Sequence, residues 1–397
     1  MSPPLVSIAM PAYNASRFIA ETIKSVQAQT FADWELVIVN DGSNDNTLEI
    51  IQSFADSRIH LISQPNQGRG PARAHAMRLT RGEYIAFLDA DDLWEPQMLE
   101  MCLDTFKAHP EAGLVHTNWR YLDEFGNKSN TPSYWQPWRG DVLDRLILDL
   151  PFITPGVMVK RQVLEKAGVL RTDYQLIDDW DMWLLLALSG CHFECVEQPL
   201  AYYRRHSANS THNYEMFYRD QIRVLNNFFA QPNVPERVKM LREKAYARAH
   251  LQYAIGLLRA ELDERAAVAL RTAFSLDPDL LNVIDTYFSI AASPRPLVGD
   301  RNLPIDLPKA ERCINVLLQA AGEERLICVS TTFLSFYALS QIAYWQRDDA
   351  RTRDWMRRAL AAEPMRLTQP QTLRWAIRSL LGANRVQRWK SLLGSLC

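Results

Sequence analysis

Short apolar runs alternate with amphipathic stretches over residues 5–89, and this alternation constrains the fold more than any other feature of the sequence. The runs rich in β-branched residues predict strands at Leu5–Met10, Glu35–Asn40, Ile59–Ser63 and Glu83–Asp89. The stretches between them predict helices, one from an N-cap at Ser16 to Gln29, one from Asn44 or Asp45 toward Phe54, and one from the Gly70-Pro71 loop to near Thr80. Such strand–helix–strand repetition predicts a parallel sheet that helices cover on both faces.

Polar residues follow three of the predicted strands. They are Pro11-Ala12-Tyr13-Asn14, Asp41-Gly42-Ser43 and Asp89-Ala90-Asp91-Asp92. In an open parallel sheet, ligands bind beyond the carboxyl ends of the strands, so the three clusters predict a ligand site at one edge of the sheet. Carboxylates two residues apart at a strand end can hold a divalent cation on a diphosphate, whereas an isolated acidic patch is usually a solvated loop. The apolar strand at 84–88 favours the cation site.

The α/β pattern continues past Asp92 and ends near residue 210. It predicts a helix at 95–107, a strand at 114–121, an aromatic, substrate-facing loop at 127–139, an amphipathic helix at 178–189 and strands at 192–196 and 201–205. From 213 onward, glycine is scarce and apolar residues recur at helical spacing. A chain of 397 residues exceeds what one core usually organises. We therefore expect an α/β domain over 1–212 and an all-helical domain over 213–397, with 294–308 as its internal loop.

Two segments of the helical half resemble each other. Glu264–Pro278 and Asp349–Pro364 each carry small residues followed by an acid and a proline. This arrangement is typical of the second helix of a tetratricopeptide repeat and suggests an array of helical hairpins. The two copies lack the regular spacing of such repeats, so a tetratricopeptide fold is a hypothesis.

The composition narrows the functional class. A formal net charge of -2 and a hydrophobic fraction of 47% indicate a globular protein and predict no nucleic-acid partner. Six scattered cysteines form no disulfide framework and no signal peptide precedes the first strand, so we expect a cytoplasmic protein. Cys191 and Cys195 lack a second ligand pair and are interpreted as buried thiols rather than a zinc site. No apolar run approaches the roughly 20 residues that cross a bilayer.

The order of motifs resembles family 2 glycosyltransferases, a large inverting group with a GT-A fold. The resemblance covers residues 5 to about 210. It rests on Pro11–Asn14, Gln29-Thr30, Val39–Asp45, Gly68 with Ala72-Arg73, Gly82–Asp92, Asp178–Asp181 and Tyr203–His206. It implies transfer of one sugar from a nucleotide-diphosphate sugar, most often a UDP-sugar, to an acceptor hydroxyl, as in the assembly of cell-surface glycans or polysaccharides. The implied cofactor is Mn²⁺ or Mg²⁺, and the implied acceptor is a glycan, a lipid-linked sugar or a protein.

The resemblance assigns the donor site to the strand-end clusters. It implies that the nucleotide pocket is lined by Pro11, Ala12, Tyr13 and Asn14, and that Asp41 accepts the imide N–H of the base. Asp89 and Ala90 are expected near the ribose. Asp91 is expected to ligate the cation, a role that Asp92 could exchange with it.

Three further residues are implied near the donor. Arg73 would contact the nucleotide or phosphate through its fork of donors, and His206 would approach the metal or diphosphate, with Arg204 as an alternative phosphate contact. From the residues alone, each position also has a plainer interpretation. Asp41 begins a good turn sequence, Arg73 suits a helix surface, and His206 suits a strand end facing solvent.

The catalytic base is implied at the start of the helix at 178–189, where the family carries a Glu-Asp pair. We choose Asp179, because an inverting transfer needs one carboxylate that takes the proton of the attacking hydroxyl. Acids in a first helical turn also cap free N–H groups, so Asp178 is interpreted as a cap beside a catalytic Asp179. Trp180 is interpreted as a packing residue or a wall of the acceptor site. Asp178 replaces the commoner glutamate and Ala74 replaces the commoner asparagine, and neither change removes a required group.

Two other classes of function stay open. A non-catalytic binding or assembly protein could keep the sugar-nucleotide fold and act through its helical domain, because helical repeats bind partners. Against this, Asp41, Asp89, Asp91 and Asp179 are all present. A nucleotidyltransferase would carry a glycine-rich, lysine-bearing loop where this chain has Pro11–Asn14.

The end of the chain is basic. Residues 364–397 contain no acid and combine tryptophan and leucine with Arg366, Arg374, Arg378, Arg385, Arg388 and Lys390. An anionic membrane surface attracts such a segment, so peripheral contact with the inner face of a membrane is a hypothesis. Docking of the segment on the preceding helices explains the same pattern.

Overall fold

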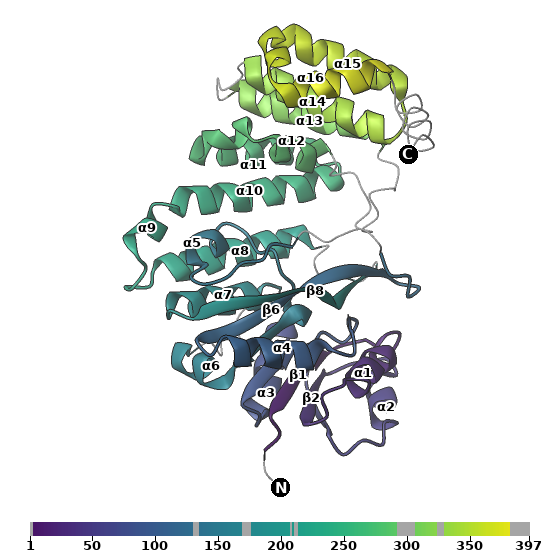
Figure 1. Cartoon of the computed structure of the whole chain (residues 1–397), viewed down its shortest axis with the longest axis vertical. Coiled ribbons are helices and arrows are strands. Elements are labelled where there is room, and N and C mark those ends of the chain that lie inside the picture. Colours follow the sequence, from purple (N-terminus) through teal and green to yellow (C-terminus); the bar gives the residue numbers. More distant parts are fainter. Residues whose placement is uncertain are drawn as a thin grey trace. The chain divides into compact units, whose positions relative to one another are not determined.

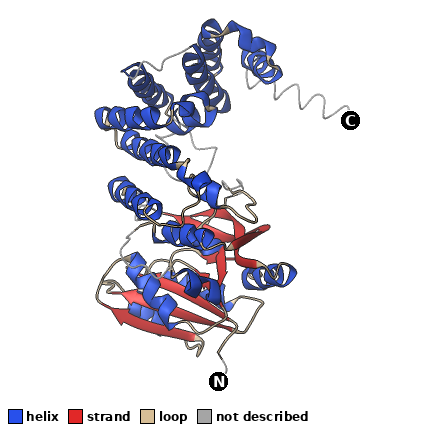
Figure 2. Cartoon of the chain, turned by 90° about the vertical axis from the view of Figure 1, so that its left-hand side faces the viewer, coloured by secondary structure: helices blue, strands red, loops and turns tan. Residues whose placement is uncertain are grey.

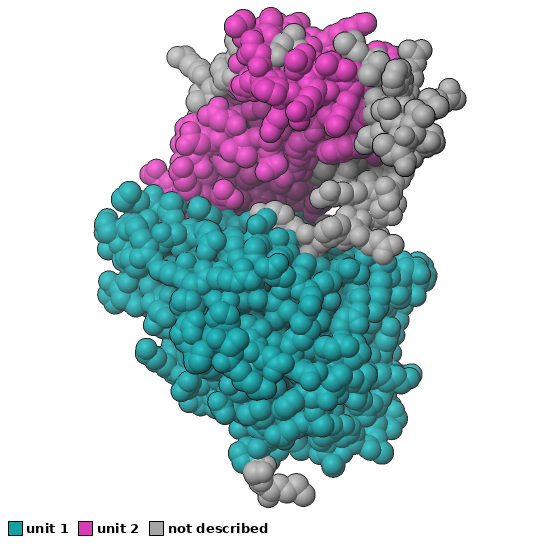
Figure 3. Space-filling view, viewed as in Figure 1, with its two compact units in different colours: residues 1–242, 298–300 teal, residues 243–297, 301–397 magenta. Residues whose placement is uncertain are grey.

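The computed structural model describes residues 3–129, 135–168, 176–206, 209, 213–291, 306–323 and 329–381. These residues group into two compact units, which Figure 3 colours separately. The first unit contains the described residues up to Arg242, and the second contains those from Glu243 onward. The helices α8 (Tyr214–Phe229) and α9 (Glu236–Lys239) therefore group with the α/β unit. The functional boundary at 212 stays a prediction.

The first unit is built on a mixed sheet, drawn in red in Figure 2. Its described strands are β1 (Val6–Ala12), β2 (Trp34–Asp41), β3 (Ile59–Gln64), β4 (Tyr84–Phe87), β5 (Leu93–Trp94), β6 (Ala112–Asp123), β7 (Val157–Lys160) and β8 (His192–Arg205). They lie in the order β3-β2-β1-β4-β7-β6-β8-β5. The neighbours from β3 to β4 pair in parallel, as predicted. The unpredicted strand β7 is antiparallel to both β4 and β6, and it makes the second half of the sheet mixed.

Helices cover both faces of the parallel half. On one face, Ile8 and Met10 belong to a core shared with Ile23 of α1 (Ile19–Gln27) and Leu103 of α4 (Met98–Ala108). On the other face, α3 (Arg69–Leu79) contacts β1 and β2. Every residue of β1 is buried, because each of its two faces meets a helix layer. The remaining helices of this unit are α2 (Thr47–Gln52), α5 (Leu143–Leu146), η1 (Thr154–Gly156), α6 (Arg161–Ala167) and α7 (Asp178–Leu188).

Three predicted boundaries are wrong, each for a local reason. Ser16 does not cap α1, which begins at Ile19, because Ser16 lies inside the turn that the Ala15 carbonyl closes by accepting from Phe18 and Ile19 (both 2.9 Å). Gly70-Pro71 lies inside the first turn of α3 rather than in a loop, since a first-turn position needs no N–H donor. The two strands expected at 192–196 and 201–205 form the single strand β8, whose pairing with β6 shifts register around Asn118.

The second unit consists of helices wherever the structure describes it, which confirms the predicted all-helical class (Figure 1). They are α10 (Arg242–Arg259), α11 (Asp263–Leu276), η3 (Pro278–Asn282), α12 (Ile284–Ala291), α13 (Leu307–Glu323), α14 (Val329–Trp345), α15 (Asp349–Ala362), η4 (Pro364–Thr368) and α16 (Pro370–Leu381). Residues 294–305 of the predicted internal loop and 382–397 of the basic segment lie outside the described residues. Among the described helices, none combines the length and apolar character of a membrane span.

The two similar segments of this unit have the same local structure. α11 leads into η3 through Asp277, and α15 leads into η4 through Glu363. Both junction residues have a φ of -141° and precede a proline that opens the 3-10 turn. The internal resemblance is therefore structural, and membership of the tetratricopeptide class stays a hypothesis.

A buried carboxylate joins the parallel strands near their amino ends. Glu35 on β2 is 2% exposed and accepts hydrogen bonds from Ser7 Oγ on β1 (2.6 Å) and from the Arg81 backbone and guanidinium before β4 (2.7 and 2.6 Å). Burial alone would raise the pKa of Glu35, but the hydrogen bonds from Ser7 and Arg81 outweigh it and hold the pKa below its ordinary value. The charged form of Glu35 therefore stabilises the folded state.

We expect Glu35→Gln to lower the free energy of unfolding at pH 7 by about 2 kcal/mol, because it removes charged hydrogen bonds from a buried site. Because the folded-state pKa is depressed, the wild-type advantage is complete above the ordinary glutamate pKa and shrinks as the pH falls below it. Urea unfolding at pH 7 and at pH 4 measures both effects. Glu49→Gln, at an exposed position on α2, is the control. An equal loss of unfolding free energy in both variants would contradict the stabilising role of Glu35.

Candidate active site

A pocket of about 620 Å³ opens at the carboxyl ends of β1, β2 and β4. The predicted site residues that line it are Pro11, Ala12, Tyr13, Asn14, Asp41, Asp89, Ala90, Asp91 and His206. The sheet therefore brings the three strand-end clusters together. Residues that no sequence motif indicated also line it, among them Arg17, Phe18, Asn66, Arg69 and Leu176.

Hydrogen bonds join the loop after β1 to the loop after β2. The Asn14 backbone N–H donates to Ser43 Oγ (3.0 Å), and Asn14 Oδ1 accepts from the Asn44 backbone (2.9 Å). Asn14 adopts a φ of 47°, a left-handed conformation that asparagine tolerates better than most residues. Beside it, the ring of Tyr13 is half exposed on the pocket wall. This wall is therefore fixed before any ligand arrives.

Asp41 holds the loop before α3. Its buried carboxylate accepts hydrogen bonds from Gln64 Nε2 (2.7 Å) and from the backbone N–H groups of Gln67 (2.9 Å) and Gly68 (2.8 Å). The next residue, Gly42, has a φ of +68°, and a Cβ placed there would lie 2.7 Å from the Asn66 backbone nitrogen. Asp41 is thus both a turn residue and a pocket residue, so the two interpretations of the sequence are compatible.

Arg73 is a buried cation between two carboxylates. Its side chain is 1% exposed and contacts Asp89 (2.6 Å) and Asp178, so it is not a surface arginine. Burial disfavours the charge of Arg73, but Asp178 and Asp89 outweigh this and hold the pKa above its ordinary value. Burial likewise opposes ionisation of Asp89, and Arg73 and Arg69 hold the Asp89 pKa below its ordinary value. Arg73 and Asp89 are therefore held in their charged forms.

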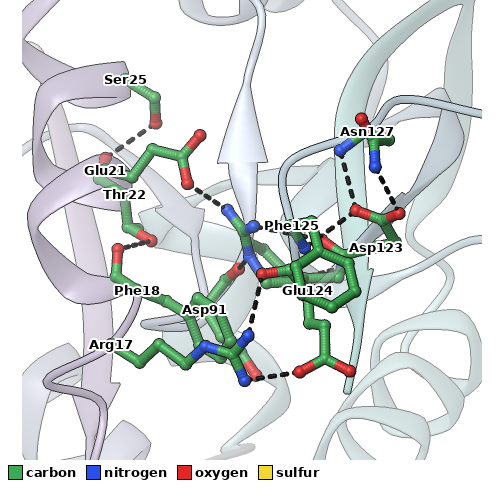
Figure 4. Close-up of polar contacts among 12 residues, drawn as sticks. Arg17, Phe18, Glu21, Thr22, Ser25, Asp91, Asp123, Glu124, Phe125 and Asn127 are labelled. Atoms are coloured by element: carbon green, nitrogen blue, oxygen red, sulfur yellow. Dashed lines mark hydrogen bonds and ion pairs between the residues drawn. The ribbon is translucent and has the colours of Figure 1, made fainter.

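Arg204 fixes the loop that carries Asp91. The buried guanidinium donates to the carbonyl groups of Asp91 (2.6 Å) and Asp123 (3.3 Å) and to the carboxylate of Glu21 (2.6 Å). Figure 4 shows these three partners converging from the loop after β4, from β6 and from α1. Because Arg204 is engaged behind the loop and is not among the described residues of the pocket wall, it supports the site rather than facing a phosphate.

Asp91 and Asp92 occupy opposite environments. Asp91 lines the pocket, and its Oδ2 lies 2.9 Å from His206 Nε2. Asp92 is 1% exposed, and one oxygen accepts from the Arg204 backbone (2.7 Å) while the other has no hydrogen-bond partner among the described residues. Burial, together with the charges of Asp91 and Asp89, raises the pKa of Asp92 well above its ordinary value. Of the two acids, Asp91 is the one that lines the pocket.

The pocket wall offers donors suited to a divalent cation. Asp91 supplies a carboxylate and His206 an imidazole, and the His206 backbone is anchored by Asn209 Oδ1 (2.6 Å). Oxygen with one imidazole nitrogen is a donor set that Mn²⁺ accepts, and a bound diphosphate can complete the coordination. The residues present therefore fit the implied metal.

Asp179 is held near the pocket by contacts that no motif predicted. One carboxylate oxygen accepts from Thr154 Oγ1 of η1, and the other accepts from the Trp180 backbone (2.8 Å). Burial, reinforced by the charge of Asp178, raises the pKa of Asp179, although Arg69 and Arg73 oppose the rise. Asp179 is not among the described residues that line the pocket.

The two residues beside Asp179 compare differently with expectation. Asp178 contacts the guanidinium groups of Arg69 and Arg73, so it anchors α7 to α3 instead of capping its own helix. Trp180 is buried, and its Nε1 donates to the Leu146 carbonyl (2.9 Å), which agrees with its interpretation as a packing residue.

Comparison with known proteins agrees with this geometry. The model of the family "Glycosyl transferase family 2" matches residues 7–168. An uncharacterised glycosyltransferase of Methanocaldococcus jannaschii is 32% identical over 213 residues, which cover 51% of this chain and 72% of that protein. The chondroitin synthase of Escherichia coli is 44% identical over 134 residues, which cover 33% of this chain and 20% of that protein.

A solved structure shares the fold. The mannosyltransferase PcManGT from Pyrobaculum calidifontis, in complex with GDP-Man and Mn²⁺, aligns with a TM-score of 0.51 and 20% identity over 86% of this chain and 87% of that one. The sheet order and the strand-end pocket are those of a GT-A glycosyltransferase domain. The chain belongs to glycosyltransferase family 2, as its motifs predicted. It spans only about a fifth of the length of the chondroitin synthase.

We expect Gly42→Ala to weaken nucleotide binding, because the added Cβ meets backbone in the loop that Asp41 holds. Gly168→Ala is a matched control, since Gly168 has a similar φ of +65° but no atom within 4 Å of an added Cβ. Each variant should lose about 1 kcal/mol of stability from its left-handed backbone. Calorimetric titration with UDP and GDP measures the nucleotide affinity of the two variants. Equal affinity in Gly42→Ala and Gly168→Ala would contradict the expectation and show that the Asp41 loop tolerates displacement.

Proposed function

We propose that the chain is an inverting, metal-dependent glycosyltransferase that moves one sugar from a UDP-sugar to an acceptor hydroxyl. The observation that carries this proposal is the convergence of three strand-end clusters on one pocket, with the Asp91–His206 pair in its wall. The family supplies the reaction class. The donor, the metal and the stereochemical course are proposals.

The nucleotide occupies the half of the pocket formed by β1 and β2. The exposed ring of Tyr13 provides a face for the base. Asp41 accepts three hydrogen bonds from the protein, and a carboxylate has about four acceptor positions, so one remains for an imide N–H. Uracil presents such a donor, which favours UDP.

The diphosphate lies beside Asp91 and His206. These two side chains would hold Mn²⁺ or Mg²⁺, which when bound neutralises the negative charge on the leaving nucleotide. PcManGT contains Mn²⁺ with its nucleotide sugar, which supports a metal in this protein. Asp89, fixed by Arg73, is placed to accept a ribose hydroxyl.

Asp179 acts as the base. Attack from the face opposite the leaving group requires one carboxylate that accepts the proton of the acceptor hydroxyl, and no covalent intermediate is formed. The raised pKa of Asp179 makes it a stronger base than an ordinary aspartate. Thr154 fixes the orientation of its carboxylate.

The acceptor is a hydroxyl of a growing cell-surface glycan or polysaccharide. The similarity to the chondroitin synthase of Escherichia coli supports this substrate class. The similarity covers 33% of this chain.

We expect Asp91→Ala to abolish metal-dependent binding of the donor, and Asp179→Asn to keep donor binding while losing at least about a thousandfold in kcat. The measurements are binding and transfer with UDP-, GDP- and dTDP-sugars, with Mn²⁺, with Mg²⁺ and with EDTA. The exposed Asp104→Asn is the control. Absence of binding by any nucleotide sugar would contradict the catalytic proposal and favour the assembly role.

We also propose that α16 contacts an anionic membrane surface. Thr372, Ala376 and Ser379 are buried, and Trp375 packs on Tyr344 (5.0 Å between ring centroids), so one face of the helix docks on its own unit. The opposite face exposes two apolar and two basic side chains, Leu373, Ile377, Arg374 and Arg378. Apolar residues flanked by arginine on an exposed helix face suit an anionic lipid surface.

We expect vesicles that contain an anionic phospholipid to pellet the full chain more strongly than neutral vesicles. Arg374→Gln/Arg378→Gln should weaken this binding at least about tenfold, since each arginine near the surface contributes about 1 kcal/mol. Leu373→Ser/Ile377→Ser should also weaken it. The control is Val268→Ser/Val283→Ser, which removes a similarly exposed pair, 54% and 45%, outside α16. Equal binding to anionic and neutral vesicles would overturn the proposal.

A further inference from the structure

Arg69 is a pocket residue that the sequence motifs did not indicate. It is the first residue of α3 and follows Gly68, whose φ is 95° and whose N–H donates to Asp41 Oδ2 (2.8 Å). The main chain at Arg69 is therefore fixed by the carboxylate proposed to recognise the base. The backbone of Arg69 therefore keeps a fixed position relative to the donor site.

The Arg69 side chain crosses from α3 to the start of α7. Its Nη2 donates to the Leu176 carbonyl and lies 3.3 Å from Asp178 Oδ1. The Leu176 backbone N–H donates in turn to Asp220 on α8 (3.0 Å). Both Arg69 and Leu176 line the pocket. One guanidinium thus belongs to the pocket wall and also holds the segment that leads into the catalytic helix.

Arg73 shares Asp178 but occupies a different position. The Arg73 side chain is 1% exposed, whereas that of Arg69 is 25% exposed. Arg73 is not among the described residues of the pocket wall, and Arg69 is. The Nε atoms of both arginines are buried and have no hydrogen-bond partner among the described residues. Of the two cations, Arg69 is the one that joins the pocket wall to the start of α7.

Arg69 also acts on Asp179. The contacts found for the Asp179 carboxylate are with Thr154 and the Trp180 backbone, so the arginines influence it through Asp178 and through their charge. Burial raises the pKa of Asp179 and the charge of Asp178 adds to the rise, whereas Arg69 opposes it more strongly than Arg73 does. Loss of Arg69 would therefore displace the start of α7 and raise the pKa of Asp179 further.

We propose that Arg69 is a positioning residue that joins the donor pocket to the start of α7 and so fixes where Asp179 meets the acceptor hydroxyl. The proposal rests on the proposed function, in which Asp179 is the base. It predicts an effect on turnover rather than on nucleotide affinity.

Arg69→Gln removes the charge and keeps a polar side chain of similar reach. We expect it to bind UDP with Mn²⁺ as the wild type does, and to lower kcat about tenfold because the base is misplaced. The acidic limb of the kcat–pH profile should move to higher pH, since a cation that lowers the pKa of Asp179 has been removed. Arg69→Lys should keep the limb near its wild-type position with a reduced kcat, because an ammonium group retains the charge without the forked geometry.

The matched control is Arg78→Gln, the same change at an exposed position on α3. Turnover is measured with the donor that is active in the nucleotide-sugar panel, and Asp179→Asn is assayed in parallel. If Asp179→Asn has the wild-type kcat, Asp179 is not the base, whatever the result for Arg69→Gln. If Asp179→Asn is inactive but Arg69→Gln leaves the limb unmoved, or loses UDP affinity alone, the proposal for Arg69 is overturned.

Discussion

The structure of the first unit depends on a buried guanidinium, that of Arg73, between the carboxylates of Asp89 and Asp178. Removing a cation from water costs several kcal/mol unless paired charges and hydrogen bonds offset it. Here the partners come from the end of β4 and from the first turn of α7, which are far apart in the sequence. The arrangement is stable only when α3, β4 and α7 are all in place, so the interaction that completes the fold also assembles the site.

The same arrangement explains how neighbouring acids acquire different chemistry. Asp89 is held ionised by cations, and Asp179, one residue beyond the salt-bridged Asp178, has its pKa raised by burial. Asp91 and Asp92 differ because the end of β4 turns one side chain into the pocket and the other into the interior. Four carboxylates on two short segments thus receive four distinct environments from the direction of each side chain, its burial and the charges around it.

The sequence predicts the parts of this site whose signal is local. Runs of β-branched residues placed β1 to β4, and the polar residues after each strand fell at one sheet edge because parallel strands end together. The contacts of Arg69 with Asp178 and of Thr154 with Asp179 have no such signal, since they join segments that meet only in the folded chain. The strand β7 was missed because four residues give too short a pattern. The start of α1 was misplaced because the turn before it depends on contacts with a later loop, as the bond from the Ser16 backbone N–H to Asp45 shows.

The hydrogen-bonded loops after β1 and β2 affect which parts of the protein can vary in sequence. Asn14 is bonded to Ser43 and Asn44, and Asp41 to the backbone that precedes α3, so the nucleotide half is ordered before a ligand enters and loses little conformational entropy on binding. Its elements all lie within the first 92 residues, whereas Thr154 and α7 belong to later segments. Under the proposed function, substitutions in those later segments can therefore alter which hydroxyl is glycosylated while the half formed by β1 and β2 is inherited unchanged.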